Sequence, residues 1–268
     1  MGEQITEHQI KMFEQDGAIC IRNLLNDAQL ETLKIGAHKA MSIAPTDPGM
    51  YYFKRIRLWQ KISQLKEICT ESHLPRIAAT MLRTKKLNLL YDQLFVKDTT
   101  MVERTTWHND QPYWPVRGGS ALSLWIAVED LDASMGTLEF IRGSHLWNAW
   151  YQPLIGSEHG TIKSMPEAQK GYIPMPDFEA ERDQHEMIMW DLNAGDAIVF
   201  NALTIHGSTG NTSSNAIRWA YSIRYAGKEN RYFDVRNIPG HNIDLENPAL
   251  KTNDPLDSEM FPVVYQTT

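Results

Sequence analysis

The chain has 268 residues, of which 42% are hydrophobic and 22% are charged, and its formal net charge is −7. This composition is typical of a globular protein, and an all-β chain of this length commonly forms one domain. The acidic balance argues against a nucleic-acid partner, which needs a basic face, and no apolar run is long enough to span a bilayer. We therefore expect a single domain, residues 1–268, that acts on a small molecule without nucleic acid or membrane as a partner.

Cysteine usage and the N-terminal residues bear on the compartment. Cys20 and Cys69 are the two cysteines, and they are far apart in the sequence. A disulfide framework is therefore not expected, and residues 1–6 lack the basic and apolar segments of a signal peptide. We predict a cytoplasmic protein.

The first 85 residues or so predict a mainly helical scaffold. Thr6 and Gln9 have capping-box spacing, and Gly17 is a stop signal, so a short helix is expected between them. Residues 18–21 are then expected to form a buried strand. A second helix is predicted from Asn26 towards Met41, and a third over about residues 75–82.

Strands dominate the rest of the chain. They are predicted over residues 87–97, 121–128, 137–141, 197–200 and 217–225. The segment 137–141 is expected to pair back onto 121–128 through a turn at 130–136. Alternation in the last strand places Arg218, Ser222 and Arg224 on one face, and the tail after Gly227 is expected to wrap the surface.

Residues 146–186 show no periodicity. A connection of this length within a compact domain is usually a lid or binding loop, or else disordered. Its aromatic residues Trp147, Trp150 and Tyr151 favour a structured, lid-like insertion.

One short segment contains candidate metal ligands. His108 and Asp110 lie two positions apart, and on an extended strand such residues point to the same face. Imidazole and carboxylate with open positions suit Fe(II), and a 2-His-1-carboxylate triad needs one further histidine. His206, after the apolar run 196–200, is our candidate.

These residues form part of an ordered set. The set comprises His108-x-Asp110, Trp125, the segment Gly-Thr-Leu-Glu-Phe-Ile-Arg-Gly-Ser-His at 136–145, His206-Gly207-Ser208, and Arg218. It resembles the phytanoyl-CoA dioxygenase family of Fe(II)/2-oxoglutarate-dependent oxygenases, over roughly residues 5–232. The resemblance implies a mainly β fold with flanking helices around a double-stranded β-helix (jelly-roll or cupin-like) core.

The resemblance also implies Fe(II), 2-oxoglutarate and O2 as cofactor and cosubstrates. It implies that His108, Asp110 and His206 bind the metal and are the catalytic centre. In this family the histidine of the Gly-Ser-His corner does not bind iron, so His145 is not assigned as a ligand.

The cosubstrate contacts are likewise implied by the resemblance. Arg218 is expected to hold the distal carboxylate of 2-oxoglutarate, and a guanidinium can do so with paired hydrogen bonds. Trp125 and Ser208 match positions that line this site, and Thr137 is a weaker candidate. A buried amide such as Gln93 is satisfied either in the core or in a polar cavity, and the resemblance favours cosubstrate contact.

The expected reaction is hydroxylation of an unactivated C–H bond, or a desaturating or ring-forming variant. Related halogenases lack the carboxylate that Asp110 supplies, so the presence of Asp110 favours these reactions over halogenation. Two alternatives remain open: a non-redox, metal-dependent cupin-like isomerase or lyase, and a non-catalytic ligand-binding member of the fold. Arg218 and Ser208 argue against the first, and the intact triad argues against the second.

Overall fold

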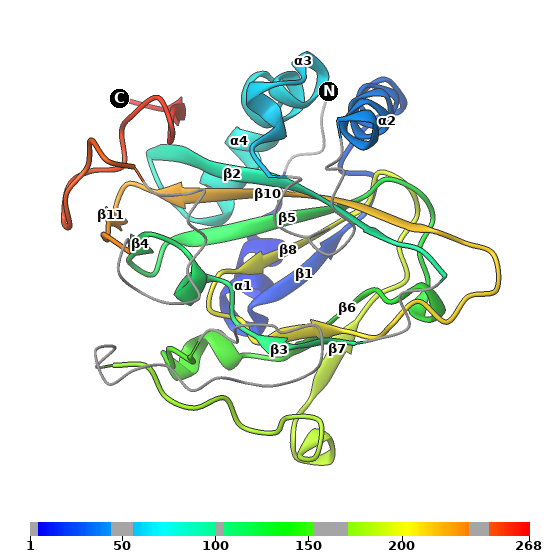
Figure 1. The fold of residues 1–268 in the computed structure, drawn as a ribbon. Helices are drawn as coiled ribbons and strands as arrows, with labels where there is room; N and C mark the ends of the chain where they lie inside the picture. Colours follow the sequence, from blue (N-terminus) through cyan, green and yellow to red (C-terminus); the bar gives the residue numbers. More distant parts are fainter. Residues whose placement is uncertain (1–4, 44–55, 100–103, 153–170, 236–246) are drawn as a thin grey trace.

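The computed structural model describes residues 5–43, 56–99, 104–152, 171–235 and 247–268, and it consists mainly of β-sheet with helices on the outside (Figure 1). In chain order, the strands of these residues are β1 (Ala18–Ile21), β2 (Lys86–Lys97), β3 (Thr105–His108), β4 (Val116–Arg117), β5 (Ala121–Ala127), β6 (Leu138–Ile141), β7 (Met187–Met189), β8 (Ala197–Asn201), β9 (His206–Ser208), β10 (Arg218–Gly227), β11 (Arg231–Tyr232) and β12 (Val263–Gln266).

The helices are mostly short. The α-helices are α1 (Glu7–Asp16), α2 (Asp27–Ser42), α3 (Ser63–Lys66) and α4 (Leu74–Met81). The single-turn segments are η1 (Leu58–Gln60), η2 (Glu67–Glu71), η3 (Gln111–Tyr113), η4 (Ala133–Met135), η5 (Ser144–Trp147) and η6 (Arg182–Gln184). None of the described helices combines the length and the apolar character that crossing a membrane requires.

Local sequence signals define the N-terminal helices. Thr6 and Gln9 form the predicted capping box, and α1 ends at Gly17, whose φ of 80° is left-handed. Asn26 and Gln29 form a second capping box at the start of α2. These side chains satisfy backbone N–H groups that have no partner within the helix, so both helices begin where the sequence predicts.

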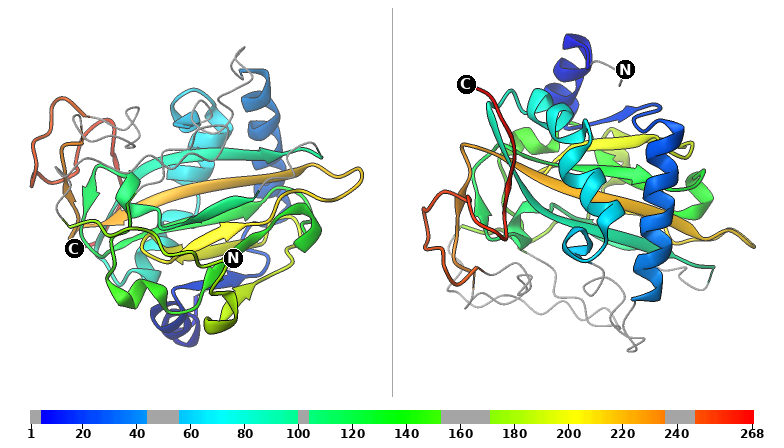
Figure 2. Two further views of the ribbon diagram at one scale, coloured as in Figure 1. Left: turned by 60° about the horizontal axis from the view of Figure 1, so that its bottom comes forward. Right: turned by 90° about the horizontal axis from the view of Figure 1, so that it is seen from above.

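Two sheets form the core of the fold. The larger sheet has the strand order β1-β8-β5-β10-β2-β12, and the smaller has the order β3-β9-β6-β7. The helices α2, α3 and α4 cover the outer face of the larger sheet (Figure 2). Leu33 and Ala37 of α2 and Ile77 of α4 are buried there together with Leu124 and Tyr221 of the sheet.

The opposite face of the larger sheet lies inside the fold. Trp125, Ile198 and Phe200 are buried on this face, in one cluster with Leu138 and Phe140 of the smaller sheet. Side chains alternate between the two faces along a strand, so the polar residues in register with Trp125 point inwards as well. The larger sheet therefore has an apolar outer face and an inner face that carries polar side chains.

The expected pairing of residues 137–141 with 121–128 is wrong. Strand β5 pairs with β8 on one edge and with β10 on the other, so neither edge is open to β6. Strand β6 pairs instead with β7 and β9 in the smaller sheet. The segment 130–136 thus connects the two sheets and is not a hairpin turn.

The C-terminal tail contributes a strand that the sequence analysis did not assign. Strand β12 pairs with β2 through Val263, Tyr265 and Gln266. Without it, β2 would be an edge strand with unpaired backbone groups. The tail therefore extends the larger sheet instead of only wrapping the surface.

A buried carboxyl group lies between the larger sheet and its helices. Asp92 accepts hydrogen bonds from the Tyr221 hydroxyl and, at 3.0 Å, from the backbone N–H of Trp59. Burial raises the pKa of Asp92 from 3.8 to about 6, and the hydrogen bond from Tyr221 offsets only part of this effect. Folding therefore favours the protonated form of this carboxyl group.

Asp92→Asn is expected to change how stability depends on pH. The folded pKa lies above the unfolded one, so the native protein loses stability as the pH rises from 3.8 to 6. One pKa unit corresponds to about 1.4 kcal/mol, so this loss amounts to about 3 kcal/mol and is absent in the variant. Urea denaturation at pH 4 and pH 7 measures it.

Asp257→Asn is the control for this experiment. The hydrogen bonds from Lys86 and Asn88 outweigh burial and lower the pKa of Asp257. Its contribution to stability is therefore present at neutral pH and is lost as the solution becomes acidic, which is the opposite direction. The free energy of unfolding of the unaltered protein is expected to differ between pH 4 and pH 7. If Asp92→Asn shows the same difference, the buried carboxyl group is not its source.

Candidate metal centre and cosubstrate site

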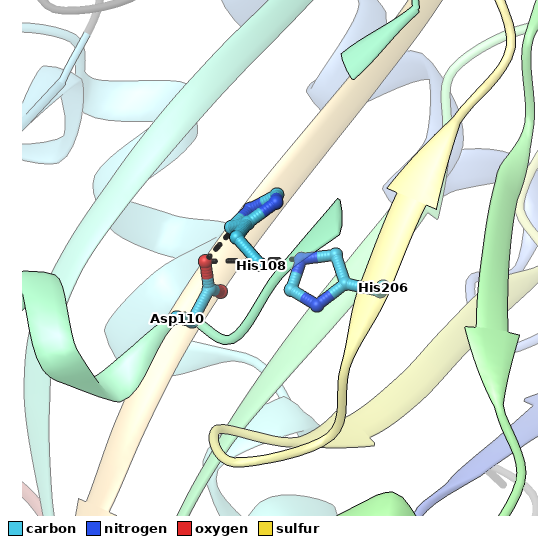
Figure 3. Close-up of side chains that lie close together, drawn as sticks. All are labelled: His108, Asp110 and His206. Carbon is cyan, nitrogen blue, oxygen red and sulfur yellow. Dashed lines mark ion pairs between the residues drawn. The ribbon is translucent and has the colours of Figure 1, made fainter. Parts of the chain in front are cut away.

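Three side chains that could hold a metal ion converge between the two sheets. His108 ends β3 and His206 begins β9, and these two residues face each other in register. Asp110 Oδ1 lies 3.7 Å from His108 Nε2 and 3.8 Å from His206 Nε2 (Figure 3). Each of the three residues offers one ligand atom, and these three atoms lie within 4.8 Å of one another. The structure thus brings together the three residues that the sequence analysis selected.

Asp110 reaches this position by a different route from the one expected. The strand ends at His108, and Asp110 has helical backbone angles, φ −72° and ψ −42°, at the start of η3. The backbone N–H of Gln111 donates to Ala202 O at 2.9 Å, which holds this turn against the segment before His206. Strand alternation therefore does not place the carboxylate beside His108; the turn does.

A contact between Nδ1 and a backbone carbonyl orients the ring of each histidine. His108 Nδ1 lies 2.8 Å from Thr106 O, and His206 Nδ1 lies 3.0 Å from Thr204 O. A carbonyl oxygen only accepts, so each Nδ1 carries the hydrogen and each Nε2 lone pair is left to face Asp110. This arrangement fixes the tautomer that a metal-binding histidine requires.

Asp110 has a supporting contact from the larger sheet. The hydroxyl of Ser123, in β5, donates to Asp110 Oδ2 at 3.3 Å. The other carboxylate oxygen, Oδ1, is the atom nearest to both histidines. Ser123 was not predicted, because nothing in its own strand distinguishes it from any other small residue.

The charge states also suit a divalent metal. Burial raises the pKa of Asp110, but the neighbouring charges of His206, Arg224 and His108 outweigh it and leave the pKa below 3.8. Burial, with His108 beside it, lowers the pKa of His206 to about 4. At neutral pH the site thus offers a carboxylate and a neutral imidazole, the forms that bind Fe(II).

The residues expected to bind the cosubstrate gather at one end of the inner face. Arg218 Nη1 donates to Gly136 O at 2.7 Å, and its guanidinium carbon lies 5.6 Å from the centre of the Trp125 ring. Thr137, next to Gly136, is fully buried, and its hydroxyl has no hydrogen-bond partner among the described residues. Arg218, Trp125 and Thr137 are therefore neighbours, although they come from three different strands or turns.

Lys97 joins this group and was not predicted. It faces Arg218 in register across β2 and β10, and its side chain is only 1% exposed. Its Nζ donates to Ser208 Oγ and to Thr209 O, both at 3.0 Å. Burial, followed by the charges of Arg218 and Arg104, lowers the pKa of Lys97 to about 7. Its sequence signal was a lysine directly after the apolar residues Leu94, Phe95 and Val96.

Gln93 lies on the inner face, between the candidate metal ligands and the residues around Arg218. It is in register with Ser222 of β10, which in turn is in register with Trp125. It is buried, and it also forms a bridge with Ile56. Its side chain therefore belongs to the same row as the cosubstrate candidates.

His145 lies apart from the triad, as expected. Its Nε2 donates to Glu14 O, in α1, at 3.1 Å. It is not one of the described residues whose ligand atoms cluster with Asp110. This corner histidine thus connects the smaller sheet to α1.

Comparisons with known proteins agree with this site. The family model for phytanoyl-CoA dioxygenase (PhyH) matches residues 13–220. Human peroxisomal phytanoyl-CoA dioxygenase is 22% identical over 265 residues, which cover 90% of this chain and 74% of the human protein. At this level of identity, the human protein is a distant relative.

Solved structures share the fold. The non-heme alpha-ketoglutarate-dependent carbocyclase SnoK from nogalamycin biosynthesis matches with a TM-score of 0.74 and 18% identity, covering 97% of this chain and 96% of SnoK. The epimerase SnoN, in complex with Fe3+, alpha ketoglutarate and nogalamycin RO, matches with a TM-score of 0.73 and 17% identity, covering 96% of this chain and 98% of SnoN. The predicted mainly β fold with a double-stranded β-helix core is confirmed.

The family model includes β2 to β9 and the first residues of β10, and with them the metal centre and the cosubstrate end. It spans more than half of the chain. The protein therefore belongs to the phytanoyl-CoA dioxygenase family of iron- and 2-oxoglutarate-dependent oxygenases.

Proposed function

We propose that this protein is an Fe(II)- and 2-oxoglutarate-dependent dioxygenase that oxidises an unactivated C–H bond of a small molecule by hydroxylation, desaturation or ring closure. The observation that carries the proposal is the orientation of the triad. Both histidines direct Nε2 towards Asp110 Oδ1 while Nδ1 of each is held by a backbone carbonyl. Family membership supports the same chemistry.

The catalytic ligands we propose are His108, Asp110 and His206. Bound Fe(II) and 2-oxoglutarate supply the oxidising chemistry, in which O2 is consumed and 2-oxoglutarate becomes succinate and CO2. The chain orients the ligands through Thr106, Thr204 and Ser123, and it holds them between the two sheets.

We assign the distal carboxylate of 2-oxoglutarate to Arg218. Ser208 lies two residues beyond His206 on β9, which is roughly 7 Å at about 3.3 Å per residue. A five-carbon diacid that starts at the metal therefore reaches the group formed by Arg218, Ser208 and Lys97. Trp125, Thr137 and Gln93 line the path between the two ends, and Thr137 supplies a buried hydroxyl with no protein partner among the described residues.

A non-redox, cupin-like isomerase or lyase remains the alternative. Such an enzyme needs the metal but not a clamp for a second carboxylate. The buried cations Arg218 and Lys97, which face each other in register, favour the oxygenase.

We also propose that residues 146–186 form a lid-like insertion of the single domain. Residues 153–170 of this segment lie outside the described residues. Its described ends place Tyr151 and Phe178 in a cluster with Trp107, next to His108. Arg182 pairs with the buried Glu139 of β6 at 2.6 Å, which ties the insertion to the smaller sheet.

A reducing compartment, the cytoplasm, suits the two free cysteines and the Fe(II) we propose.

Anaerobic titration with Fe(II) and then 2-oxoglutarate tests the proposal. We expect the weak visible charge-transfer band of a metal-chelated keto acid in the unaltered protein and its loss in His206→Ala. His145→Ala is the matched control, because that histidine donates to the backbone of α1 and lies outside the triad, and it should keep the band. Fe(II) binding without a band would favour the cupin-like alternative, and a band that persists in His206→Ala would refute the ligand assignment.

A further inference from the structure

A second arginine lies deep on the inner face, beyond the metal centre as seen from the cosubstrate end. Arg224 is 4% exposed and is in register with Tyr91 on one side and Ser123 on the other. Ser123 is the residue whose hydroxyl supports Asp110. The guanidinium therefore belongs to the immediate surroundings of the triad, and its charge acts on both Asp110 and His206.

Two of the three nitrogen atoms of the Arg224 guanidinium have no partner among the described residues. Its Nε and Nη1 atoms are buried and have no hydrogen-bond partner among the described residues. The residues described also place no carboxylate oxygen within 4.0 Å of it, whereas Arg142, for example, pairs with both Asp16 and Glu186. A buried guanidinium with unused donors is unfavourable unless an acceptor reaches it.

Aromatic rings hold the side chain of Arg224 in place. Its guanidinium carbon lies 4.5 Å from the centre of the Tyr91 ring and 5.4 Å from that of Phe95. These contacts stabilise a cation, but the ring faces offer no oxygen or nitrogen acceptor to its N–H groups. The arrangement is that of a preorganised oxyanion receptor.

Charge counting supports the same conclusion. With the proposed cofactor and cosubstrate bound, the two positive charges of the metal are balanced by Asp110 and by the keto-acid carboxylate. Histidine binds a metal as the neutral imidazole, so the two histidines add no charge and the positive charge of Arg224 is left over. An anionic ligand group would balance it.

The distal carboxylate of 2-oxoglutarate is too far away to be that anion. Arg218 and Arg224 lie six residues apart on one strand, roughly 20 Å at about 3.3 Å per residue. A 2-oxoglutarate molecule extended from the metal towards Arg218 leads away from Arg224. We infer that the primary substrate carries a carboxylate or similar oxyanion, and that Arg224 binds this group and so positions the substrate beside the metal. This inference rests on the function proposed above.

The oxyanion could belong to 2-oxoglutarate or to the primary substrate. The variants Arg224→Gln and Arg218→Gln separate these two sources. The anaerobic charge-transfer band gives the Kd for 2-oxoglutarate in the unaltered protein, in Arg224→Gln and in Arg218→Gln. We expect Arg218→Gln to weaken 2-oxoglutarate binding much more than Arg224→Gln does. An equally large loss in Arg224→Gln would show that Arg224 holds the keto-acid end of 2-oxoglutarate, and this would overturn the inference.

Thermal denaturation of the anaerobic Fe(II)–2-oxoglutarate protein then tests the substrate side. The probes are acetate, benzoate and octanoate, each compared with its primary amide at the same concentration. We expect at least one acid to bind tenfold or more tightly than its amide, and this preference to vanish in Arg224→Gln and to persist, weakened, in Arg224→Lys. Equal binding of every acid and amide, or a preference unchanged in Arg224→Gln, would overturn the inference. If the band itself does not form in the unaltered protein, the proposed function fails instead.

Discussion

Asp110→Ala is expected to lower succinate release from 2-oxoglutarate by more than about a hundredfold. Substituting a residue that only supports a metal ligand already lowers metal affinity or activity by about 10–100-fold. Asp110 supplies the only carboxylate in the described cluster and lies within 4 Å of both histidine Nε2 atoms. Its loss removes the carboxylate from the proposed ligand set and leaves the two histidines. Fe(II) affinity and succinate release, measured on the same preparation, are the readouts.

Ser123→Ala is the matched control for Asp110→Ala. It removes the 3.3 Å hydrogen bond to Asp110 Oδ2 but keeps the carboxylate itself. We expect a loss of about tenfold, at the lower end of the range for supporting residues. Circular dichroism shows whether both variants remain folded. Normal turnover in a folded Asp110→Ala protein would remove Asp110 from the proposed metal site.

Arg218→Ala is expected to raise the Kd for 2-oxoglutarate by about thirtyfold or more, since truncating one partner of a buried, hydrogen-bonded charge pair costs about 2–5 kcal/mol. The residue is 2% exposed, and its position is fixed by the hydrogen bond to Gly136 O and by the Trp125 ring. The anaerobic charge-transfer titration measures the Kd. The affinity for Fe(II) alone should not change, because Arg218 lies at the far end of the inner face.

Two further variants interpret this result. Arg218→Lys keeps the charge but loses the paired geometry, so an intermediate Kd is expected. Lys97→Met removes the buried ammonium that faces Arg218 and bonds to Ser208. If the Kd is unchanged in Arg218→Ala and rises in Lys97→Met, then Lys97, and not Arg218, is the main partner of the distal carboxylate.

Local signals in the sequence predicted most of the elements. The capping boxes at Thr6 and Asn26 depend on residues three positions apart, and the alternation in β10 depends on residues two positions apart. Such short-range patterns are set by backbone geometry and can be seen without the fold. The order of His108, Asp110, His206 and Arg218 likewise indicated the family before any distance was known.

Other features depended on which strand edges were already occupied. The pairing of β6 was mispredicted because β8 and β10 take both edges of β5. Strand β12 was missed because its role is to cover the edge of β2, more than 160 residues away in the sequence. No local pattern reports whether an edge elsewhere in the chain is open.

The sequence by itself thus indicated the fold class and the family of this protein, through an ordered set of side chains that resembles the family, and it selected three candidate metal ligands. The tertiary structure alone showed that a turn places Asp110, that Lys97 reaches Ser208, and that Arg224 is buried with unused donors beside the triad. These facts concern distances between residues far apart in the chain. Sheet register and burial decide such distances, and both are properties of the whole fold.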